Sequence, residues 1–508
     1  MTTDTPLKGA ALWFTAIVLA TANFVAVLDM TIANVSVPNI AGALGISSSQ
    51  GTWVITSYSV AEAIIVPLTG WLAGRFGAVR VFVGAMMMFA SFSAFCGLSN
   101  SLGMLVAGRI MQGLSGGPLM PLSQTLLLKI FPKEKAAAAT ALWAMTTLVA
   151  PVAGPILGGW ICDNHSWPGI FYINLPVIAI CAPIAWKMLR RYESDRVKAP
   201  IDVVGLALLV IFVGALQIML DLGKDHDWFE SSLICWLAIV AVIGFAAFLI
   251  WEFTEKHPIV DLRVFRHRGY AAGVVTLSLV YGTFFGANVL TPLWLQSYMG
   301  YTATWAGETT AWTGGFAVFM APVAGMLLGK GVDPRRLIFV GTSWLALVTA
   351  SRTIADTDMT YWQISAPLML MGLGLPFFFV PVTALALGNV EEHETASAAG
   401  LMNFLRTLSG AFATSIVQTA WDDKTTYMHA ELSGLADASG EVTKSLLHSG
   451  VSMEYVRLFL DHITQSQAVM LATNHLMGAM AICFALGAFV IWLAPRPARA
   501  IALGEGGH

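Results

Sequence analysis

Fourteen long apolar stretches follow one another along the chain, and they constrain its fold more than any other feature. A bilayer core about 30 Å thick requires roughly 20 apolar residues per helix, which is about the length of each stretch. Single β-strands cannot span lipid because their backbone groups would stay unpaired. The sequence therefore predicts an all-α integral membrane protein with fourteen transmembrane helices. The stretches cover residues 12–35, 52–73, 79–98, 102–128, 136–161, 170–188, 201–222, 232–254, 269–297, 303–328, 335–354, 361–386, 396–420 and 467–494.

The composition agrees with this class and excludes others. Only 11% of the residues are charged, against roughly 25% in soluble domains. The net charge of -3 argues against a nucleic-acid partner. The five cysteines lack metal-ligand spacing, so we predict no metal and interpret them as small apolar residues. No phosphate loop, HExxH, G-x-S-x-G or CxxC pattern occurs, so we predict no cofactor, no ATP-driven transport and no enzyme.

The lysines and arginines indicate the orientation, because positively charged loops stay in the cytoplasm. Of the 27 Lys and Arg residues, twenty lie in loops on the side of the N-terminus. Five lie on the opposite side, namely Lys224, Arg352, Lys424, Lys444 and Arg457. The first stretch is too long for a signal peptide and no cleavage site follows it. We therefore predict that both termini are cytoplasmic.

Two segments in different halves of the chain repeat one pattern. Residues 67–80 read PLTGWLAGRFGAVR, and residues 322–335 read PVAGMLLGKGVDPR. Five pairs match at a constant offset of 255, namely Pro67 and Pro322, Gly70 and Gly325, Gly74 and Gly329, Arg75 and Lys330, and Arg80 and Arg335. A weaker echo relates residues 109–122 to residues 369–382. The repeat predicts two pseudo-symmetric six-helix bundles, a recurring transporter design with the substrate path between the repeats.

The chain divides accordingly into three predicted parts. Residues 1–195 form an N-terminal six-helix bundle, residues 196–264 an inserted two-helix hairpin, and residues 265–508 a C-terminal six-helix bundle. The long outer loop at about 421–466 alternates small, polar and apolar residues, which predicts short amphipathic helices. A docking or covering element and an ordinary solvated loop are equally open interpretations of it.

Ionisable side chains within the spans are the strongest functional candidates, because an unpaired charge in lipid costs several kcal/mol. At 1.5 Å per residue, Asp29 lies roughly 6 Å below the outer boundary and Arg109 roughly 10 Å below it. These depths allow an ion pair, which could be purely structural. A carboxylate that faces a water-filled cavity beside an arginine is also what a proton-coupling site needs.

Two glutamates are further candidates for proton coupling. Glu62 lies near the midplane of the second span, and Glu308 lies roughly 7 Å deep in the tenth. Either could handle a proton or a cation, and a satisfied polar contact or solvation is the alternative. We predict coupling by Asp29, Arg109, Glu62 and Glu308, with Asp29 as the first choice.

Residues 150–159 read APVAGPILGG, an unusual concentration of helix-weakening residues within an apolar span. Glycines on one face let a neighbouring helix approach closely. Prolines bend the helix and free carbonyl groups that partners must satisfy. We predict a tight, bendable helix contact formed by Pro151, Gly154, Pro155, Gly158 and Gly159.

Several segments together resemble the major facilitator superfamily. GWLAGRFGAVR resembles the loop motif after its second helix, and LVAGRIMQG resembles its fourth-helix motif. LDMTIANVSVP resembles the first-helix motif of its fourteen-helix drug:proton antiporters, and APVAGPILGG resembles their fifth-helix motif. The likeness continues along the chain through QGTWVITSY, PLSQTLLL, LQIMLDLGKDHDW, HPIVDL, GYTATWAG and NFLRTLSG, and it is closest to the EmrB-type permeases.

The resemblance implies the major facilitator fold and a proton-coupled multidrug efflux antiporter for hydrophobic or amphiphilic compounds. Permeases of this type reside in the bacterial inner membrane. They work with a periplasmic adaptor (membrane fusion protein) and an outer-membrane channel. The resemblance also implies that the fifth-helix motif lies between the two halves and seals the path in one state.

The resemblance assigns roles to further residues. The expected conformational positions, besides the fifth-helix motif, are Gly70, Gly74, Arg75, Gly77, Arg80 and Arg406. The expected substrate contacts along the path are Asn23, Asn34, Trp53, Tyr58, Gln112, Trp143, Asn288 and Phe378. The family's loop motif usually carries an acidic residue where this chain has Gly74. The charge relay that locks one state therefore lacks one member here.

Three rival functions make different predictions. A symporter or uniporter for a single metabolite, on the same fold, would move its substrate with the proton gradient or independently of it. A membrane-embedded lipid-modifying enzyme would release a chemically altered product. A pure scaffold would leave the buried carboxylates without a purpose.

Overall fold

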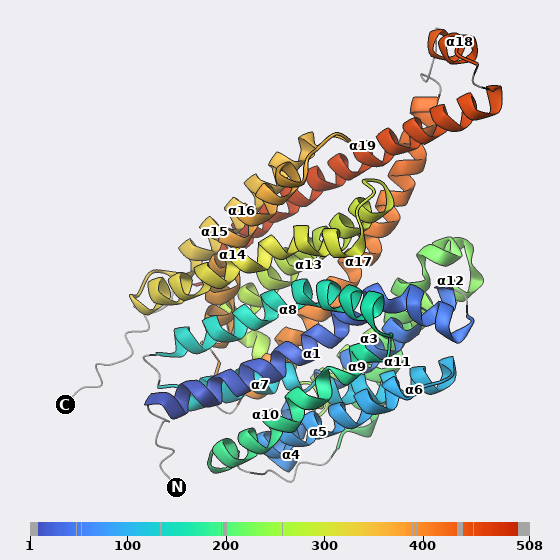
Figure 1. Ribbon diagram of the computed structural model, residues 1–508. Coiled ribbons are helices and arrows are strands. Elements are labelled where there is room, and N and C mark those ends of the chain that lie inside the picture. Colours follow the sequence, from blue (N-terminus) through green and yellow to red (C-terminus); the bar gives the residue numbers. More distant parts are fainter. Residues whose placement is uncertain are drawn as a thin grey trace.

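The protein is all-helical in the part of the chain that the structure describes. The computed structural model describes residues 9–46, 48–51, 53–132, 135–194, 196, 201–256, 258–388, 390–391, 394–433, 440–450 and 452–495. No β-strand occurs within these ranges, which confirms the predicted all-α class. Long helices run side by side, and α18 lies at one end of the molecule (Figure 1).

The helices follow the apolar stretches closely. The N-terminal part contains α1 (Gly9–Leu44), α2 (Ser48–Gly51), α3 (Trp53–Ile65), α4 (Thr69–Phe76), α5 (Ala78–Gly97), α6 (Leu102–Gly116), α7 (Leu119–Ile130), α8 (Ala136–Asn164), α9 (Gly169–Tyr172) and α10 (Asn174–Leu189). The middle contains α11 (Val203–Leu222) and α12 (Ser232–Thr254). The C-terminal part contains α13 (Arg268–Ser297), α14 (Ala303–Gly329), α15 (Pro334–Ser351), α16 (Tyr361–Leu387), α17 (Thr395–Ser433), α18 (Glu441–His448) and α19 (Met453–Val490). Short 3₁₀ turns include η5 (Leu262–Arg266) and η6 (Arg352–Ile354).

The predicted number of fourteen spans is not reached by length and hydropathy alone. Within the described residues, eleven helices meet those criteria, or twelve if α3 and α4, bent by 58°, form one broken span. The fourth predicted stretch is divided into α6 and α7, of 15 and 12 residues, on either side of Gly117 and Pro118. The thirteenth lies in α17, which is long but carries Arg406 and the polar segment WDDK.

The fifth-helix motif remains helical in α8 despite Pro151 and Pro155. A Cβ atom on Gly154 would overlap with the Thr31 side chain of α1, so only glycine permits this approach. On another side of α8, Ile156 contacts Gly307 of α14. The motif is therefore a close helix contact, and Gly158 and Gly159 are buried with it.

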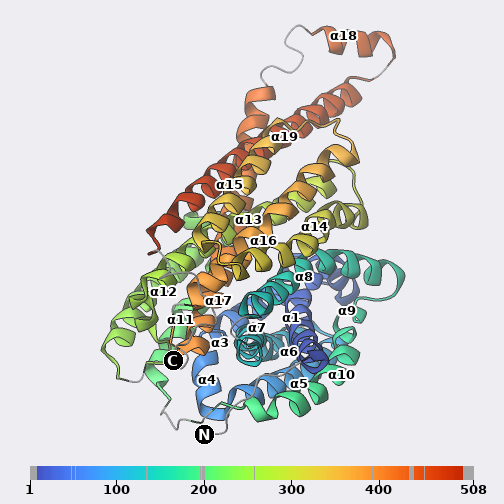
Figure 2. The same cartoon turned by 90° about the vertical axis from the view of Figure 1, so that its left-hand side faces the viewer.

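A small number of helix pairs connect the N-terminal helices with the C-terminal helices. α8 packs against α1, α14 and α16, while α4 and α7 pack against α17. The pair α11 and α12 pack on each other, and α11 also contacts α3 and α17. Most of α12 stays exposed at the edge of the molecule, as expected for a helix that faces lipid (Figure 2).

The loop predicted at about 421–466 has a different structure from the one expected. α17 has 39 residues and α19 has 38, and both continue beyond the other helices as a projecting pair (Figures 1 and 2). The short helix α18 lies at the tip of this projection. The prediction of short amphipathic helices is thus correct for α18 and wrong for its flanks, because two long helices simply extend past the bundle.

Candidate functional site

Asp29 and Arg109 form an ion pair among the N-terminal helices. Arg109 Nη1, from α6, donates to Asp29 Oδ2, from α1, over 2.6 Å, and neither side chain is exposed. Arg109 Nε also donates to the carbonyl oxygen of Val54 over 2.9 Å. The guanidinium lies 4.2 Å from the centre of the Tyr58 ring. A charge-assisted hydrogen bond, a backbone acceptor and an aromatic face together fix this arginine.

Three polar side chains complete the pair. Gln112 Nε2 donates to Asp29 Oδ1 over 2.9 Å, and Gln112 Oε1 accepts from Arg109 Nη1 at 2.8 Å. Asn174, at the start of α10, donates to Asp29 Oδ1 over 2.6 Å, and Ser93 of α5 accepts from both amides. Asn174 and Ser93 were not among the site residues predicted from the sequence. A search for polar residues inside apolar spans could have found them, because buried polar groups need partners.

This network separates Asp29 from water. Its carboxylate accepts three hydrogen bonds, and the exposed fraction of the residue is 0%. Of the two alternatives for this ion pair, the buried geometry of this conformation agrees with the structural one, because Asp29 is not exposed to solvent. The network joins α1, α5, α6 and α10, so it can hold these helices in register.

Glu62, on α3, has a different environment. Its residue is 5% exposed, and its Oε2 atom has no hydrogen-bond partner among the described residues. The charges that act on it most strongly are those of Arg406 and then Arg109. A buried carboxyl with an open oxygen can exchange a proton while breaking fewer bonds than Asp29 would.

Arg406 reaches the same region from α17. It is 2% exposed, and its guanidinium lies 5.5 Å from the ring centre of Trp143 and 5.1 Å from that of Tyr281. Its Nη2 atom contacts the sulfur of Met120, and its Nε atom has no partner among the described residues. We call Glu62, Arg406, Trp143, Tyr281 and Met120 the central cluster. Its members come from α3, α7, α8, α13 and α17, which are distant in sequence.

The predicted substrate contacts in the N-terminal helices have various surroundings. Asn23 donates to Thr146 of α8 over 2.8 Å, so it joins two helices. Gln112 belongs to the Asp29 network, and the Tyr58 hydroxyl has no partner among the described residues. Trp143 belongs to the central cluster and is almost completely buried.

The other predicted contacts lie apart from the central cluster or outside the described side chains. Trp53 is half-buried at the start of α3. Phe378 is buried on α16, with its ring centre 4.9 Å from that of Phe379. Asn288 lines a cavity between α13, α14 and α16. The side chain of Asn34 lies outside the described part of the structure.

Arg352 is a buried residue that the sequence analysis assigned to an outer loop. It is 8% exposed, begins η6 directly after α15, and lines the same cavity as Asn288. Its position at the end of an apolar stretch made it resemble a loop cation. Glu308 differs in the other direction: it was predicted to lie within a span, but it is exposed on α14 near the start of the helix.

The loop motif lies where α4 meets α17. A Cβ atom on Gly70 would lie 2.8 Å from Ser397 Cα, so glycine permits this close approach. The space around Gly74 is open, and Arg75 beside it is half-buried. Gly77 has a φ of 98°, a conformation that favours glycine.

The repeated arginines make parallel contacts. Arg80 Nε lies 3.8 Å from Glu193 Oε2, and Glu193 follows the last helix of the N-terminal part. Arg335 Nη1 donates over 3.2 Å to the carbonyl oxygen of Ala494, which follows the last helix of the C-terminal part. Each arginine thus ties its loop motif to the end of the same group of helices.

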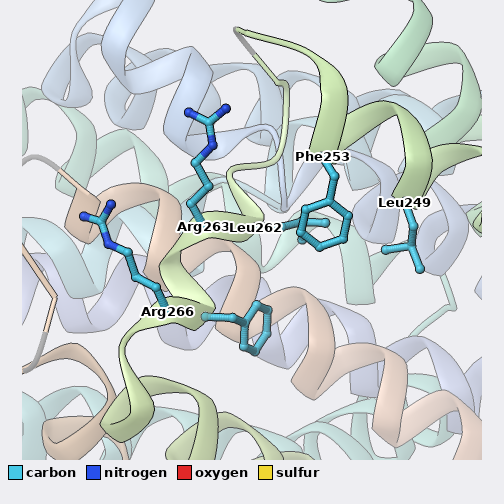
Figure 3. Close-up of a pocket in the computed structure, with 6 residues that line it drawn as sticks. Leu249, Phe253, Leu262, Arg263 and Arg266 are labelled. Atoms are coloured by element: carbon cyan, nitrogen blue, oxygen red, sulfur yellow. The ribbon is translucent and has the colours of Figure 1, made fainter.

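Two surface features lie apart from these buried sites. A groove between α12 and η5 is lined by Leu249, Phe253, Leu262, Phe265 and two arginines, and Figure 3 shows the arginine head groups turned away from Phe253. Its apolar lining suits contact with lipid. Elsewhere, His267, Glu391 and Glu394 lie close enough to hold a metal, but Arg266 donates to both glutamates over 3.1 and 2.8 Å. An arginine therefore already offsets part of the negative charge of this cluster.

Comparison with known proteins identifies a matching family and similar sequences. Residues 19–414 match the family described as Major Facilitator Superfamily. The chain is 41% identical over 497 residues to the multidrug export protein EmrB of Haemophilus influenzae, covering 97% of each chain. It is also 41% identical over 507 residues to the fatty acid resistance protein FarB of Neisseria gonorrhoeae, covering 99% of each.

Two solved structures share the fold at 13% sequence identity. The human organic anion transporter MFSD10 gives a TM-score of 0.59 and covers 95% of this chain and 100% of its own. The proton:xylose symporter XylE gives a TM-score of 0.60 and covers 96% of each chain. At this identity the likeness concerns the fold alone.

Proposed function

The chain belongs to the major facilitator superfamily as an efflux permease of the EmrB type, and we propose that it exports hydrophobic and amphiphilic compounds in exchange for protons. Relatives named for multidrug export and fatty acid resistance match almost its whole length. The exchange with protons is our inference from its buried charges.

The central cluster is the observation that carries the proposal. Glu62 and Arg406 are both buried, each has an atom without a hydrogen-bond partner in the described structure, and each acts on the other's charge. The Trp143 and Tyr281 rings flank the arginine and supply apolar, polarisable surface. Such a site can bind an amphiphilic molecule whose arrival or departure changes the charge on Glu62.

We propose different roles for the two buried carboxylates. The Asp29 carboxylate is satisfied by three hydrogen bonds and stabilises one conformation, while Glu62 exchanges the proton. This reverses the order that span depth alone suggested, because depth does not distinguish a satisfied carboxylate from an unsatisfied one. Glu308 is exposed in this conformation, so it is the least favoured of the three carboxylates.

We also propose that this conformation is closed at the end formed by α4 and the start of α17. The Gly70 contact with Ser397 supports this, as does Gly400, where a Cβ atom would lie 3.1 Å from the carbonyl oxygen of Val66. Opening that end would require these helices to separate. Gly74 borders open space, so the acidic residue usual at that position is not needed to form the contact.

The membrane arrangement is part of the proposal. Counting the α6–α7 pair and α17 with the twelve other spans gives fourteen, and the excess of Lys and Arg on one side supports cytoplasmic termini in a bacterial inner membrane. Residues 1–195 and 265–508 would be the moving halves and residues 196–264 the insertion. The α17–α19 projection would then extend into the periplasm, where it could contact an adaptor that leads to an outer-membrane channel.

Transport in proteoliposomes tests the proposal directly. A lipophilic dye should move opposite to an imposed proton gradient, and Glu62→Gln should abolish this gradient dependence while dye binding survives. Asp29→Asn and Glu308→Gln serve as matched carboxyl-to-amide controls. Dye movement in the direction of proton flow, or without gradient dependence, would favour a symporter or uniporter instead. Loss of coupling in Asp29→Asn but not in Glu62→Gln would return the coupling role to Asp29.

A further inference from the structure

Arg352 is buried among the C-terminal helices without a carboxylate beside it. Its Nη2 atom donates to Thr291 Oγ1 of α13 over 2.8 Å. Among the described residues, no Asp or Glu oxygen lies within 4.0 Å of its guanidinium. Taking a charge out of water is costly unless a partner of opposite charge compensates it. The protein itself does not provide that partner here.

The guanidinium borders a cavity of mixed character between α13, α14 and α16. The polar part of the lining consists of Arg352, Asn288, Thr291, Thr310 and Thr313. The apolar part consists of Phe284, Ala287, Leu368 and Met371. A positive charge, an amide and hydroxyl groups therefore line one small cavity together with apolar side chains.

This cavity corresponds to the Asp29 network of the N-terminal helices. A Cβ atom on Gly113 of α6 would lie 2.5 Å from the carbonyl oxygen of Tyr58, and one on Gly372 of α16 would overlap with the carbonyl oxygen of Thr313. Thr313 follows Tyr58 by 255 residues, which is the offset of the sequence repeat. The contact of α6 with α3 is therefore equivalent to the contact of α16 with α14.

The equivalence shows what has replaced the charge network. We take Gly113 and Gly372 as equivalent positions of α6 and α16, and residues that precede them by the same number of positions correspond. For α1 and α13, residues separated by the repeat offset of 255 correspond. Three pairs result. The pairs are Gln112 and Met371, Arg109 and Leu368, and Asp29 and Phe284. All three C-terminal members line the Arg352 cavity. The carboxylate is thus absent where its counterpart would lie, while Arg352 brings a positive charge from another helix.

We propose that this cavity binds a small monoanion, which supplies the negative charge that Arg352 lacks. A guanidinium donates to a carboxylate or a halide, and Asn288, which lines the same cavity, carries an amide that offers a further donor. Free chloride and the carboxylate of an apolar ligand share this chemistry, and the experiment below distinguishes the two sources. The anion-binding proposal does not rest on the proposed export function. Anion binding can be measured on the purified protein without any transport.

Anion binding to the purified full chain in detergent tests the proposal. Equilibrium dialysis with radioactive chloride, and competition by decanoate with decanol as the uncharged control, would measure affinity for both sources. We expect saturable binding of one anion per chain in the wild type. Arg352→Gln should weaken it about tenfold or more, because hydrogen bonds to a charged group are lost. Competition by decanoate at lower concentration than acetate would assign the site to apolar carboxylates, and equal competition would assign it to free anions.

Matched variants separate binding from folding. Asn288→Leu keeps the arginine and should weaken binding less than Arg352→Gln does, while Arg263→Gln changes an exposed arginine and should leave binding unchanged. Each variant is compared only if its gel-filtration profile matches the wild type. Absence of saturable anion binding in the wild type would overturn the proposal. Unchanged affinity in both Arg352→Gln and Asn288→Leu would overturn it as well.

Discussion

Arg109 and Arg352 are both buried, one among the N-terminal and one among the C-terminal helices, but their surroundings differ. Arg109 donates to a carboxylate oxygen at 2.6 Å and lies against an aromatic ring. Arg352 donates to a hydroxyl at 2.8 Å and borders a cavity. Equivalent helices of the two parts therefore pack in the same way, but they do not carry the same charged residues. One part of the molecule neutralises its arginine internally, and the other leaves the charge available to a ligand.

Removing the Asp29 carboxylate should have the largest effect on stability. Asp29→Ala leaves Arg109 buried without a counter-charge, which costs about 3–5 kcal/mol. Unfolding in mixed micelles of dodecylmaltoside and sodium dodecyl sulfate would measure the loss of unfolding free energy.

The double variant Asp29→Ala/Arg109→Leu provides the control for that prediction. It removes both charges, so it should be more stable than Asp29→Ala alone by about 1–3 kcal/mol, given that unpaired buried charges are the main penalty. If the double variant were less stable than either single variant, the network would act through packing instead of charge, and the contrast with Arg352 would fail.

The glycine contacts that support the two sites should respond alike in stability but differently in ligand binding. Gly113→Ala and Gly372→Ala each insert a methyl group against a backbone carbonyl, and overpacking of this kind costs about 1–3 kcal/mol. The same micellar unfolding experiment measures both. Only Gly372 lies against a residue that lines the Arg352 cavity, namely Thr313, so only Gly372→Ala should weaken anion binding. An effect of Gly113→Ala on anion binding would contradict the separation of the two sites.

Replacing Arg352 itself should cost little, in contrast to the loss of Asp29. Arg352→Met removes a buried charge that lacks a carboxylate, and Thr291 keeps the bond that it donates to the Ala287 carbonyl. We expect the unfolding free energy in anion-free buffer to stay within about 1 kcal/mol of the wild type. Adding chloride should stabilise the wild type but not the variant. A loss as large as that of Asp29→Ala would show that a counter-charge is already bound.

The positions of the helices could be predicted from the sequence better than the side-chain contacts between them. Apolar length and polar boundaries are local properties, so the positions of α5 or α12 follow directly from them. The pairing of Asp29 with Arg109 was also accessible, because depth along a span restricts which charges can meet. By contrast, the partners of Asn174, near the start of one predicted span, and of Arg352, at the end of another, come from other helices. Only the tertiary packing of several helices reveals these partners.

The smallest expected effect concerns the pair of Arg335 and Asp333. The Asp333 carboxylate is partly exposed, so this pair provides a reference for the fully buried pair of Arg109 and Asp29. Arg335 Nη2 donates to Asp333 Oδ2 over 2.8 Å, and this hydrogen bond holds the pKa of Asp333 below its ordinary value. Because the pKa is lowered in the folded state, its stabilisation is present above the unfolded pKa of about 3.9 and is lost as the pH falls through the folded value.

Asp333→Asn keeps an acceptor for the Arg335 N–H at the start of α15 but removes the charge. It should therefore cost about 0.5 kcal/mol near neutral pH and less near pH 3, because a partly exposed pair contributes little and part of that contribution is lost on protonation. Thermal unfolding of wild type and variant at both pH values checks this. A loss near neutral pH that matched the effect of Asp29→Ala would mean that burial is not what makes the Arg109 pair strong, and the comparison of buried arginines would then need a different explanation.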